Sequence, residues 1–190
     1  GYTTGVKEEE KIISIKAPVF SFAKLKDVDS ALGPEMKSTG EAMGRDANLQ
    51  KALTKAFKSA GIKIPRYGTI LVTIADKHKD EVLPLLKRFH ECGFKFLATK
   101  GTTKFLEEHH LPVNRVQKIG RADRDLLDDI KEGQVQMIIN TITKGKNVES
   151  DGFKMRQAAV QNGVLCMTSI DTTKAILETI ELNSLGTLPL

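Results

Sequence analysis

The chain has 190 residues, 40% of them hydrophobic, which suits one full soluble domain with some additional chain. No apolar run approaches the roughly 18–20 residues of a membrane span, and the start, GYTTGVKEEEK, lacks the apolar core of a signal peptide, so we expect a cytoplasmic protein without a membrane partner. The net charge is +5, but 29 basic residues are mixed with 24 acidic ones, which favours a phosphorylated small molecule at least as much as nucleic acid. We expect no nucleic-acid partner.

The first 45 residues differ from the rest. The stretch IISIKAPVFSF (12–22) alternates like a strand and then meets Pro18. The stretch LGPEMKSTGEAMG (32–44) places three glycines and a proline among polar residues. Residues 1–45 are therefore predicted to be an appendage and connector without a core of their own.

A linking helix is predicted over residues 46–61. Its apolar residues recur at helical spacing: Leu49, Leu53, Ala56 and Phe57. Asp46 is a candidate cap for the start of this helix and Gly61 for its end.

From residue 62 onward, short apolar strands alternate with helices. The predicted strands are residues 68–75, 94–99, 114–119, 135–140 and 164–169, and the predicted helices are residues 77–93, 103–110, 123–133, 151–163 and 171–182. Asp171 is expected to open the last helix. This alternation indicates one α/β domain over residues 62–190, with a doubly wound, mainly parallel five-stranded sheet, Rossmann-like, and helices on both faces.

Polar residues gather where the predicted strands turn into helices, which is where such sheets bind ligands. The turn ATKGTT (98–103) offers the hydroxyls of Thr99, Thr102 and Thr103. Gly101 lets the backbone come close to a ligand, and the start of a helix adds free N–H groups. The combination suits an anion, although threonines and a glycine also form ordinary capped turns.

Lys79 and Lys118 lie on neighbouring turns and could close on the same phosphate, or simply be surface lysines. Asp123 lies beside another of these turns and could be a general base or a helix cap. Cys92 and Cys166 have neither CxxC spacing nor a histidine cluster, so no metal site is expected. We also expect no catalytic residue.

Several stretches resemble the C-terminal end of the large subunit of carbamoyl-phosphate synthetase: LGPEMKSTGEAMG (32–44), ATKGT (98–102), Lys118 followed by a helix ending KEG (131–133), and IINT (138–141). The resemblance covers nearly the whole chain. It implies that residues 1–45 are the tail of the preceding ATP-grasp unit and that residues 46–61 link it onward. Residues 62–190 then correspond to the allosteric domain, which has the methylglyoxal-synthase-like fold.

In that family the allosteric domain binds a nucleotide effector. The two threonines of a T-x-G-T turn and two lysines hold its phosphate, and they match Thr99, Thr102, Lys79 and Lys118. An N-T-T stretch completes the site and falls on Asn140 and Thr141. Because this chain reads NTITKG, either Ile142 or Thr143 stands at the second threonine. We expect Asn140, Thr141 and Thr143 near the ribose or base.

The resemblance implies a regulatory domain without activity of its own. UMP is the first expected effector, followed by IMP and phosphoribosyl pyrophosphate. The parent would be an ATP-dependent, glutamine-hydrolysing ligase that uses Mg²⁺ or Mn²⁺ and makes carbamoyl phosphate for pyrimidine and arginine synthesis. Its partners would be the rest of the large subunit and a glutaminase small subunit, with a homo-oligomer also expected; the domain itself needs no cofactor.

Two other functions stay open. Methylglyoxal synthase is similar in fold and carries its catalytic aspartate in a G-G-D turn, with a histidine after the fourth strand. Asp123 falls at the position of that aspartate, but Arg121 and Ala122 replace the glycines and no histidine follows His110, which argues against a phosphate lyase of this type. The other alternative is a degenerate pocket in a structural or oligomerisation domain.

Overall fold

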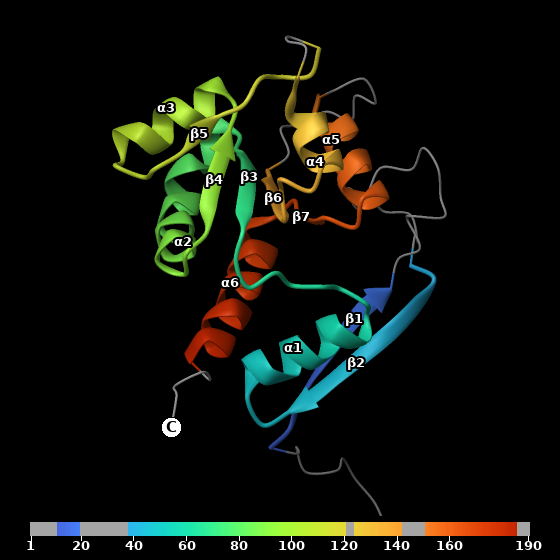
Figure 1. Ribbon diagram of the computed structural model, residues 1–190. Coiled ribbons are helices and arrows are strands. Elements are labelled where there is room, and N and C mark those ends of the chain that lie inside the picture. The colour runs from blue at the N-terminus through green and yellow to red at the C-terminus, as the bar shows by residue number, and fades with distance from the viewer. Residues whose placement is uncertain (1–10, 20–37, 121–123, 142–150, 186–190) are drawn as a thin grey trace, which may run out of the picture.

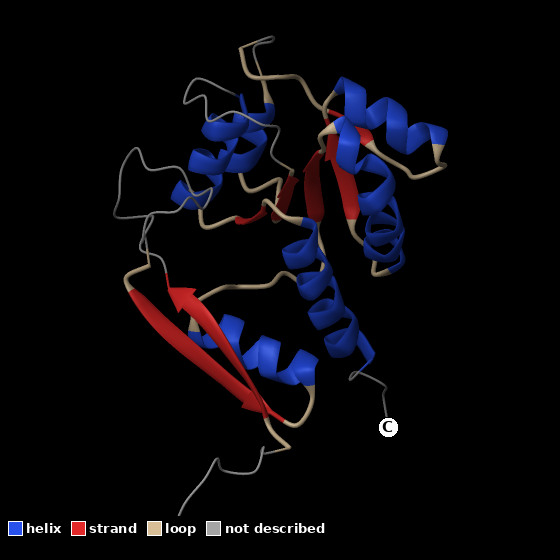
Figure 2. Cartoon of the chain, turned by 180° about the vertical axis from the view of Figure 1, so that it is seen from behind, coloured by secondary structure: helices blue, strands red, loops and turns tan. Residues whose placement is uncertain are grey.

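Two separate β-sheets organise the chain (Figures 1 and 2). The computed structural model describes residues 11–19, 38–120, 124–141 and 151–185, with side chains as far as residue 182. In the smaller sheet, β1 (Ile13–Val19) pairs antiparallel with β2 (Gly40–Asp46). The larger sheet has five strands in the order β5-β4-β3-β6-β7.

All neighbouring strands of the larger sheet are parallel: β3 (Thr69–Thr73), β4 (Lys95–Ala98), β5 (Asn114–Arg115), β6 (Met137–Asn140) and β7 (Leu165–Met167). The chain adds β4 and β5 on one side of β3 and then returns to add β6 and β7 on the other. The turns that follow β3 and β6 therefore diverge at the switch point of the sheet, the usual place for a ligand in such folds.

Helices cover both faces of this sheet (Figure 1). One face carries α2 (Lys79–Glu91), α3 (Lys100–Glu108) and α6 (Ile170–Leu185), and the other carries α4 (Leu126–Lys131) and α5 (Asp151–Gln161). Successive residues of β3 point to opposite faces, so Ile70 and Val72 pack under α2 and α6 while Leu71 packs under α4 and α5. The doubly wound α/β fold predicted from the sequence is confirmed.

The N-terminal hairpin carries its own helix, α1 (Leu49–Ser59). The helix lies close against β2 because small residues meet there, with Ala52 and Ala56 fully buried over Gly44. The predicted cap was wrong: the side chain of Asn48 accepts the N–H of Lys51 at 3.0 Å and caps the helix. Asp46 instead ends β2.

The apolar face predicted for α1 is only partly correct. Leu49 is 41% exposed, whereas Phe57 packs against the core of the larger sheet. Lys55 reaches back to Asp46 at 2.8 Å, and this hydrogen bond lowers the pKa of the carboxyl group. The side chains that pack α1 on the hairpin are thus the small ones, and of these the helical spacing had identified Ala56 but not Ala52.

The hairpin and α1 lie at the end of the molecule opposite the carboxyl ends of the large-sheet strands (Figure 1). There α1 contacts α6, and α6 is joined to α2 by two hydrogen bonds from Arg88 to Glu181, at 2.8 and 2.6 Å. The carboxylate raises the pKa of Arg88. Contacts therefore run continuously from the hairpin through α6 to α2.

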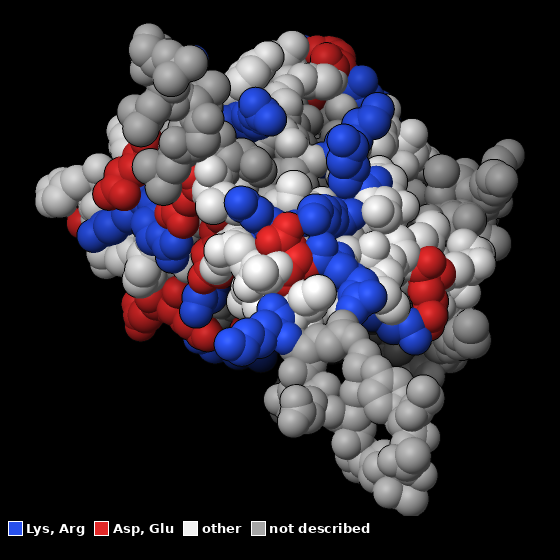
Figure 3. Space-filling model, turned by 90° about the horizontal axis from the view of Figure 1, so that it is seen from below, with Lys and Arg blue, Asp and Glu red and all other residues white. Residues whose placement is uncertain are grey.

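Positive charge concentrates on the hairpin and α1. The described residues 11–19 and 38–68 contain eight Lys and Arg but only Glu41 and Asp46 as acids, and each acid is paired with a lysine. Basic side chains run across the middle of this side of the molecule (Figure 3). Most of the excess charge thus lies away from the predicted phosphate site and does not support it.

Two helices begin earlier than predicted. Thr99 has an extended backbone and precedes the first residue of α3, so Lys100 to Thr103 form its first turn, three residues before the predicted start. At α6, Ser169 Oγ accepts the N–H of Thr172 at 3.2 Å, and Asp171 lies inside the first turn instead of opening the helix. None of the described helices is long and apolar enough to cross a membrane.

Replacing Gly44 by Ala should destabilise the packing of α1 on the hairpin. An added methyl group would lie 2.1 Å from the backbone oxygen of Ala52 and 2.4 Å from the nitrogen of Ala56, so helix and strand must separate. We expect a loss of about 1–3 kcal/mol, measured by urea denaturation with hydrogen exchange of the α1 amides. Gly40→Ala is the control, since its nearest neighbour would be 3.9 Å away; equal stability of the two variants would contradict this packing.

Candidate functional site

The three threonines that surround Gly101 have different roles in the structure. Thr103 donates its hydroxyl proton to the carbonyl of Ala98 at 2.9 Å, so this hydroxyl can no longer donate to an anion. Thr102 Oγ1 accepts the backbone N–H of Ile74 at 3.4 Å and keeps its proton. Thr99 is half-buried and its side chain contacts no polar group of the described chain. Of these three threonines, Thr103 is therefore the one whose hydroxyl proton is already used within the protein.

Two backbone N–H groups at the start of α3 are also available. The N–H groups of Thr102 and Thr103 both donate to the carbonyl of Thr99, at 2.9 Å each. Those of Lys100 and Gly101 have no acceptor among the described residues, as expected at a helix start. A Cβ added at Gly101 would meet nothing within 4 Å, so a ligand can approach the backbone there.

Lys79 reaches from the first residue of α2 to this helix start. Its Nζ lies 3.4 Å from the carbonyl oxygen of Gly101 and 5.4 Å from the ring centre of Phe105. Its side chain is only 19% exposed. The structure thus brings the predicted lysine directly beside the predicted threonine turn.

Asp76 is a neighbour of this lysine that the sequence analysis did not consider. Its Oδ1 lies 2.7 Å from Lys79 Nζ, although the Asp76 side chain is 93% exposed. The two residues are three apart, across a single 3₁₀ turn (Asp76–His78), so the i,i+3 spacing was the available signal. A negative charge therefore lies within the candidate anion site.

Thr141, just beyond β6, is tied to the turn after β3. Its Oγ1 accepts the N–H of Ala75 at 2.8 Å, and its own N–H donates to Thr73 at 3.1 Å. Thr141 is buried, but its hydroxyl proton is not used in the Ala75 contact. Threonines from two different turns thus bind adjacent N–H groups of the turn after β3.

Asn140 uses both ends of its amide within the protein. Its Oδ1 accepts from Arg156 at 2.9 Å, and its Nδ2 donates to Thr73 at 2.7 Å. Because arginine can only donate, this contact fixes which end of the amide points toward Thr73. Asn140 thus lies beside the switch point but serves first to hold β6 and β3 in place.

Arg156 is a second residue that the sequence analysis did not consider. It lies on α5 and is 6% exposed, in a helix whose other buried residues are apolar or small. A buried arginine needs partners for its fixed donors, and Asn140 supplies one of them. A lone arginine in a mostly apolar helix face is the only signal the sequence offers.

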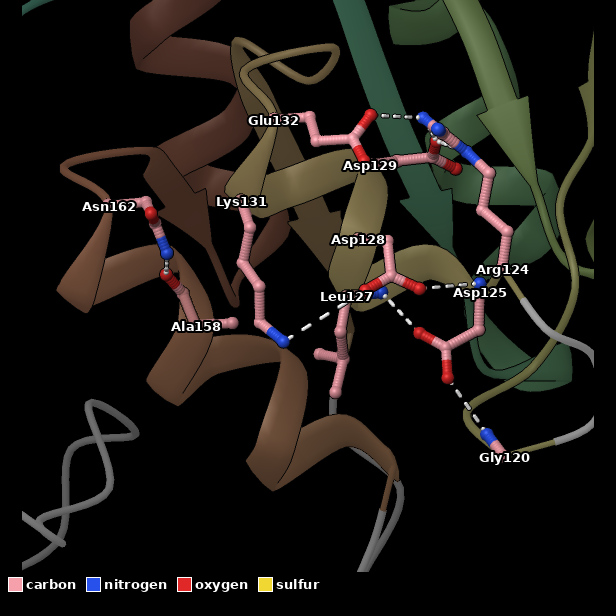
Figure 4. Close-up of polar contacts among 10 residues, drawn as sticks. All are labelled: Gly120, Arg124, Asp125, Leu127, Asp128, Asp129, Lys131, Glu132, Ala158 and Asn162. Atoms are coloured by element: carbon pink, nitrogen blue, oxygen red, sulfur yellow. Dashed lines mark hydrogen bonds and ion pairs between the residues drawn. The ribbon is translucent and has the colours of Figure 1, made fainter.

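Lys118 lies on the turn after β5, and backbone N–H groups on both sides of Lys118 form hydrogen bonds that fix this turn. Before it, the N–H of Val116 donates to Ala98 at 2.9 Å, and after it the N–H of Gly120 donates to Asp125 at 2.8 Å (Figure 4). Lys118 itself is exposed and pairs with no described residue. Since β5 neighbours β4, its ammonium group is available on the turn next to that of Thr99.

All described acidic residues in and directly beside α4 take part in hydrogen bonds or ion pairs (Figure 4). Asp125 and Asp128 form a capping box at the start of the helix. Asp129 and Glu132 each bind Arg124, at 2.7 and 2.8 Å, and raise its pKa. The cap considered for Asp123 is therefore provided by Asp125.

Some predicted positions lie outside the described residues: Arg121, Ala122, Asp123, Ile142 and Thr143. Cys92 and Cys166 are half-buried, reduced thiols, and burial raises the pKa of Cys92. In the part of the chain that the structure describes, no group of three or more His, Cys, Asp or Glu residues could hold a metal ion.

A model of the MGS-like domain family matches residues 81–168. Residues 81–168 are an MGS-like domain. The matched segment runs from the first turn of α2 to the residue after β7, so it includes the threonine turn, Lys118, Asn140 and Thr141. Lys79 lies two residues before it. The methylglyoxal-synthase-like fold expected from the sequence is confirmed.

The hydroxyl of Thr141 should matter for stability. Thr141→Val keeps the shape of the side chain but leaves the buried N–H of Ala75 without an acceptor, so we expect a loss of about 1–3 kcal/mol in urea denaturation. Thr141→Ser retains the hydroxyl and should keep most of the stability. A valine variant as stable as the serine variant would show that this hydrogen bond contributes nothing.

Proposed function

We propose that the MGS-like domain of this chain is the effector-binding domain of a carbamoyl-phosphate synthetase large subunit, and that it binds a nucleotide phosphate such as UMP or IMP. MGS-like domains occur in these large subunits. The observation that carries the proposal is the approach of Lys79 to the carbonyl of Gly101, at 3.4 Å, beside N–H groups that have no described acceptor. A cation and free donors at one helix start are what a phosphate requires.

The phosphate would be held by donors from three turns. Lys79 and Lys118 supply charge, Thr99 and Thr102 supply hydroxyl protons, and α3 supplies the N–H groups of Lys100 and Gly101. Thr103 would support the site through its contact with Ala98 and would not touch the ligand. Thr141 retains a hydroxyl proton for the ribose or base, and Thr143 is proposed beside it. Asn140 would act mainly by positioning β6.

Regulation requires that the effector favour one conformation of the synthetase over another, typically by about 1–3 kcal/mol. Lys79 begins α2, α2 is joined to α6 through Arg88 and Glu181, and α6 contacts α1. We propose that this series of contacts carries the effect from the nucleotide site to the hairpin. Residues 1–45 would then connect it to the ATP-grasp active sites.

The rest of the large subunit and a glutaminase small subunit are the proposed partners, and self-association of the parent is a further proposal. The basic surface of the hairpin and α1 would face the preceding part of the synthetase. The parent would use ATP with Mg²⁺ or Mn²⁺ at sites in its ATP-grasp units, and this domain would only sense the nucleotide. A cytoplasmic location follows from this proposed role.

Lys118→Ala should weaken UMP binding by about 1–3 kcal/mol, because a charge-assisted contact to the phosphate is lost. Stability should not change, since Lys118 pairs with no described residue. Isothermal titration calorimetry with UMP measures the effect. Lys104→Ala, an exposed lysine on α3, is the matched control. Equal affinity of wild type and Lys118→Ala would contradict the proposed site, and no binding by the wild type at millimolar UMP would favour a structural domain.

Gly101→Ala should weaken UMP binding without lowering the stability of the domain. Position 101 is helical, and an added methyl group would meet no protein atom, so thermal stability should stay equal or rise by up to about 1 kcal/mol. The same methyl group would stand where the phosphate approaches the backbone, so UMP affinity should fall by about 1–3 kcal/mol. Unchanged affinity in calorimetry would mean that no ligand contacts the start of α3.

The phosphate lyase is the second candidate function, and the exposed carboxylate of Asp76 beside Lys79 is the observation that keeps it open. A turnover assay with dihydroxyacetone phosphate separates the two. The regulatory proposal predicts no methylglyoxal above the uncatalysed rate. Measurable turnover that is lost in Asp76→Asn would replace it with the lyase.

A further inference from the structure

Asp76 and Lys79 form an ion pair inside the proposed phosphate site. The carboxylate is 2.7 Å from the ammonium group, yet the Asp76 side chain is 93% exposed while that of Lys79 is 19% exposed. Moving the carboxylate away from the lysine would therefore expose little additional surface and break no described contact of Asp76 other than this pair. The ion pair is therefore the interaction of the proposed site that an incoming ligand can most easily replace.

Lys79 does not depend on Asp76 for its position. Its Nζ also contacts the carbonyl oxygen of Gly101 at 3.4 Å and lies 5.4 Å from the ring centre of Phe105. Both contacts leave the positive charge of the lysine uncompensated, whereas the carboxylate of Asp76 neutralises it. Asp76 is thus the one described group that competes with an incoming anion for this charge.

We propose that Asp76 is a built-in counter-ion of Lys79 that a ligand phosphate must displace, so that Asp76 lowers the affinity of the site for a phosphorylated ligand. The inference rests on the proposed function, because it concerns the same site. A monoester carries close to two negative charges at neutral pH and out-competes a single carboxylate for Lys79. A phosphodiester or a carboxylate carries one charge and has no such advantage.

A second effect acts in the same direction. Once displaced, the Asp76 carboxylate remains near the bound phosphate, since its backbone lies in the 3₁₀ turn directly before Lys79. Like charges held close together repel, and this lowers the affinity further. Removing the charge of Asp76 therefore removes both the competing ion pair and the repulsion.

Asp76→Asn tests the inference, with Asp80→Asn as the matched control. Both changes remove one negative charge within three residues of Lys79, but Asp80 is an exposed residue of the first turn of α2 that pairs with no described residue. We expect Asp76→Asn to bind UMP about 3- to 10-fold more tightly than wild type, and Asp80→Asn to stay within about twofold. Calorimetry at fixed ionic strength measures both.

The methyl ester of UMP, a phosphodiester that carries one negative charge, tests whether the effect of Asp76 depends on the charge of the ligand. Asp76→Asn should bind both ligands more tightly than wild type, and the gain should be larger for UMP, because the displaced carboxylate repels its two negative charges more strongly than the single charge of the diester. Similar gains in UMP affinity for Asp76→Asn and Asp80→Asn would show that only the loss of one negative charge matters. That result would overturn the inference. Weaker UMP binding by Asp76→Asn would also overturn it, because Asp76 would then position Lys79.

The two proposals fail in different ways. If neither wild type nor any variant binds UMP or inorganic phosphate, the proposed function fails, and the inference with it. If wild type binds UMP and Lys118→Ala weakens that binding, the proposed phosphate site is supported. The comparison of Asp76→Asn with Asp80→Asn then tests only the role of Asp76.

Discussion

Two adjacent backbone N–H groups in the turn after β3, those of Ile74 and Ala75, are bound by threonine hydroxyls from other turns. Thr102 supplies one hydroxyl from α3 and Thr141 supplies the other from the end of β6. Ile74 and Ala75 are buried, so without these acceptors both N–H groups would cost free energy. This arrangement joins the two sides of the sheet at its switch point and holds the turn before Lys79 against Thr102 and Thr141.

The same hydrogen bonds determine which threonine hydroxyl protons are still available to bind a ligand. A threonine that accepts an N–H keeps its proton, so Thr102 and Thr141 can still donate, whereas Thr103 has already donated to Ala98. The proposed site would thus combine these donors with the charges of Lys79 and Lys118. On α4, the described carboxylates are committed to helix capping or to Arg124.

The doubly wound parallel sheet and the positions of most turns could be predicted because they depend on local periodicity and on the regular alternation of strands and helices, whereas the order of the strands was not predicted. The roles of individual side chains could not. Starting α3 at Lys100 instead of Thr103 changes which threonine hydroxyls point into the protein, and sequence alone did not fix that start. Arg156 looks like any surface arginine of an amphipathic helix until its burial is known, and the pairing of Asp76 with Lys79 depends on a short 3₁₀ turn.

The central claim is that a nucleotide phosphate binds at the start of α3. The most direct measurement is an amide NMR titration of the isotope-labelled chain with UMP, and with uridine, which lacks the phosphate. We predict that UMP produces its largest amide shifts at Lys100 and Gly101, whose N–H groups have no described acceptor, and that uridine leaves these two signals in place. No shift at these amides with millimolar UMP, or equal shifts with uridine, would contradict the account.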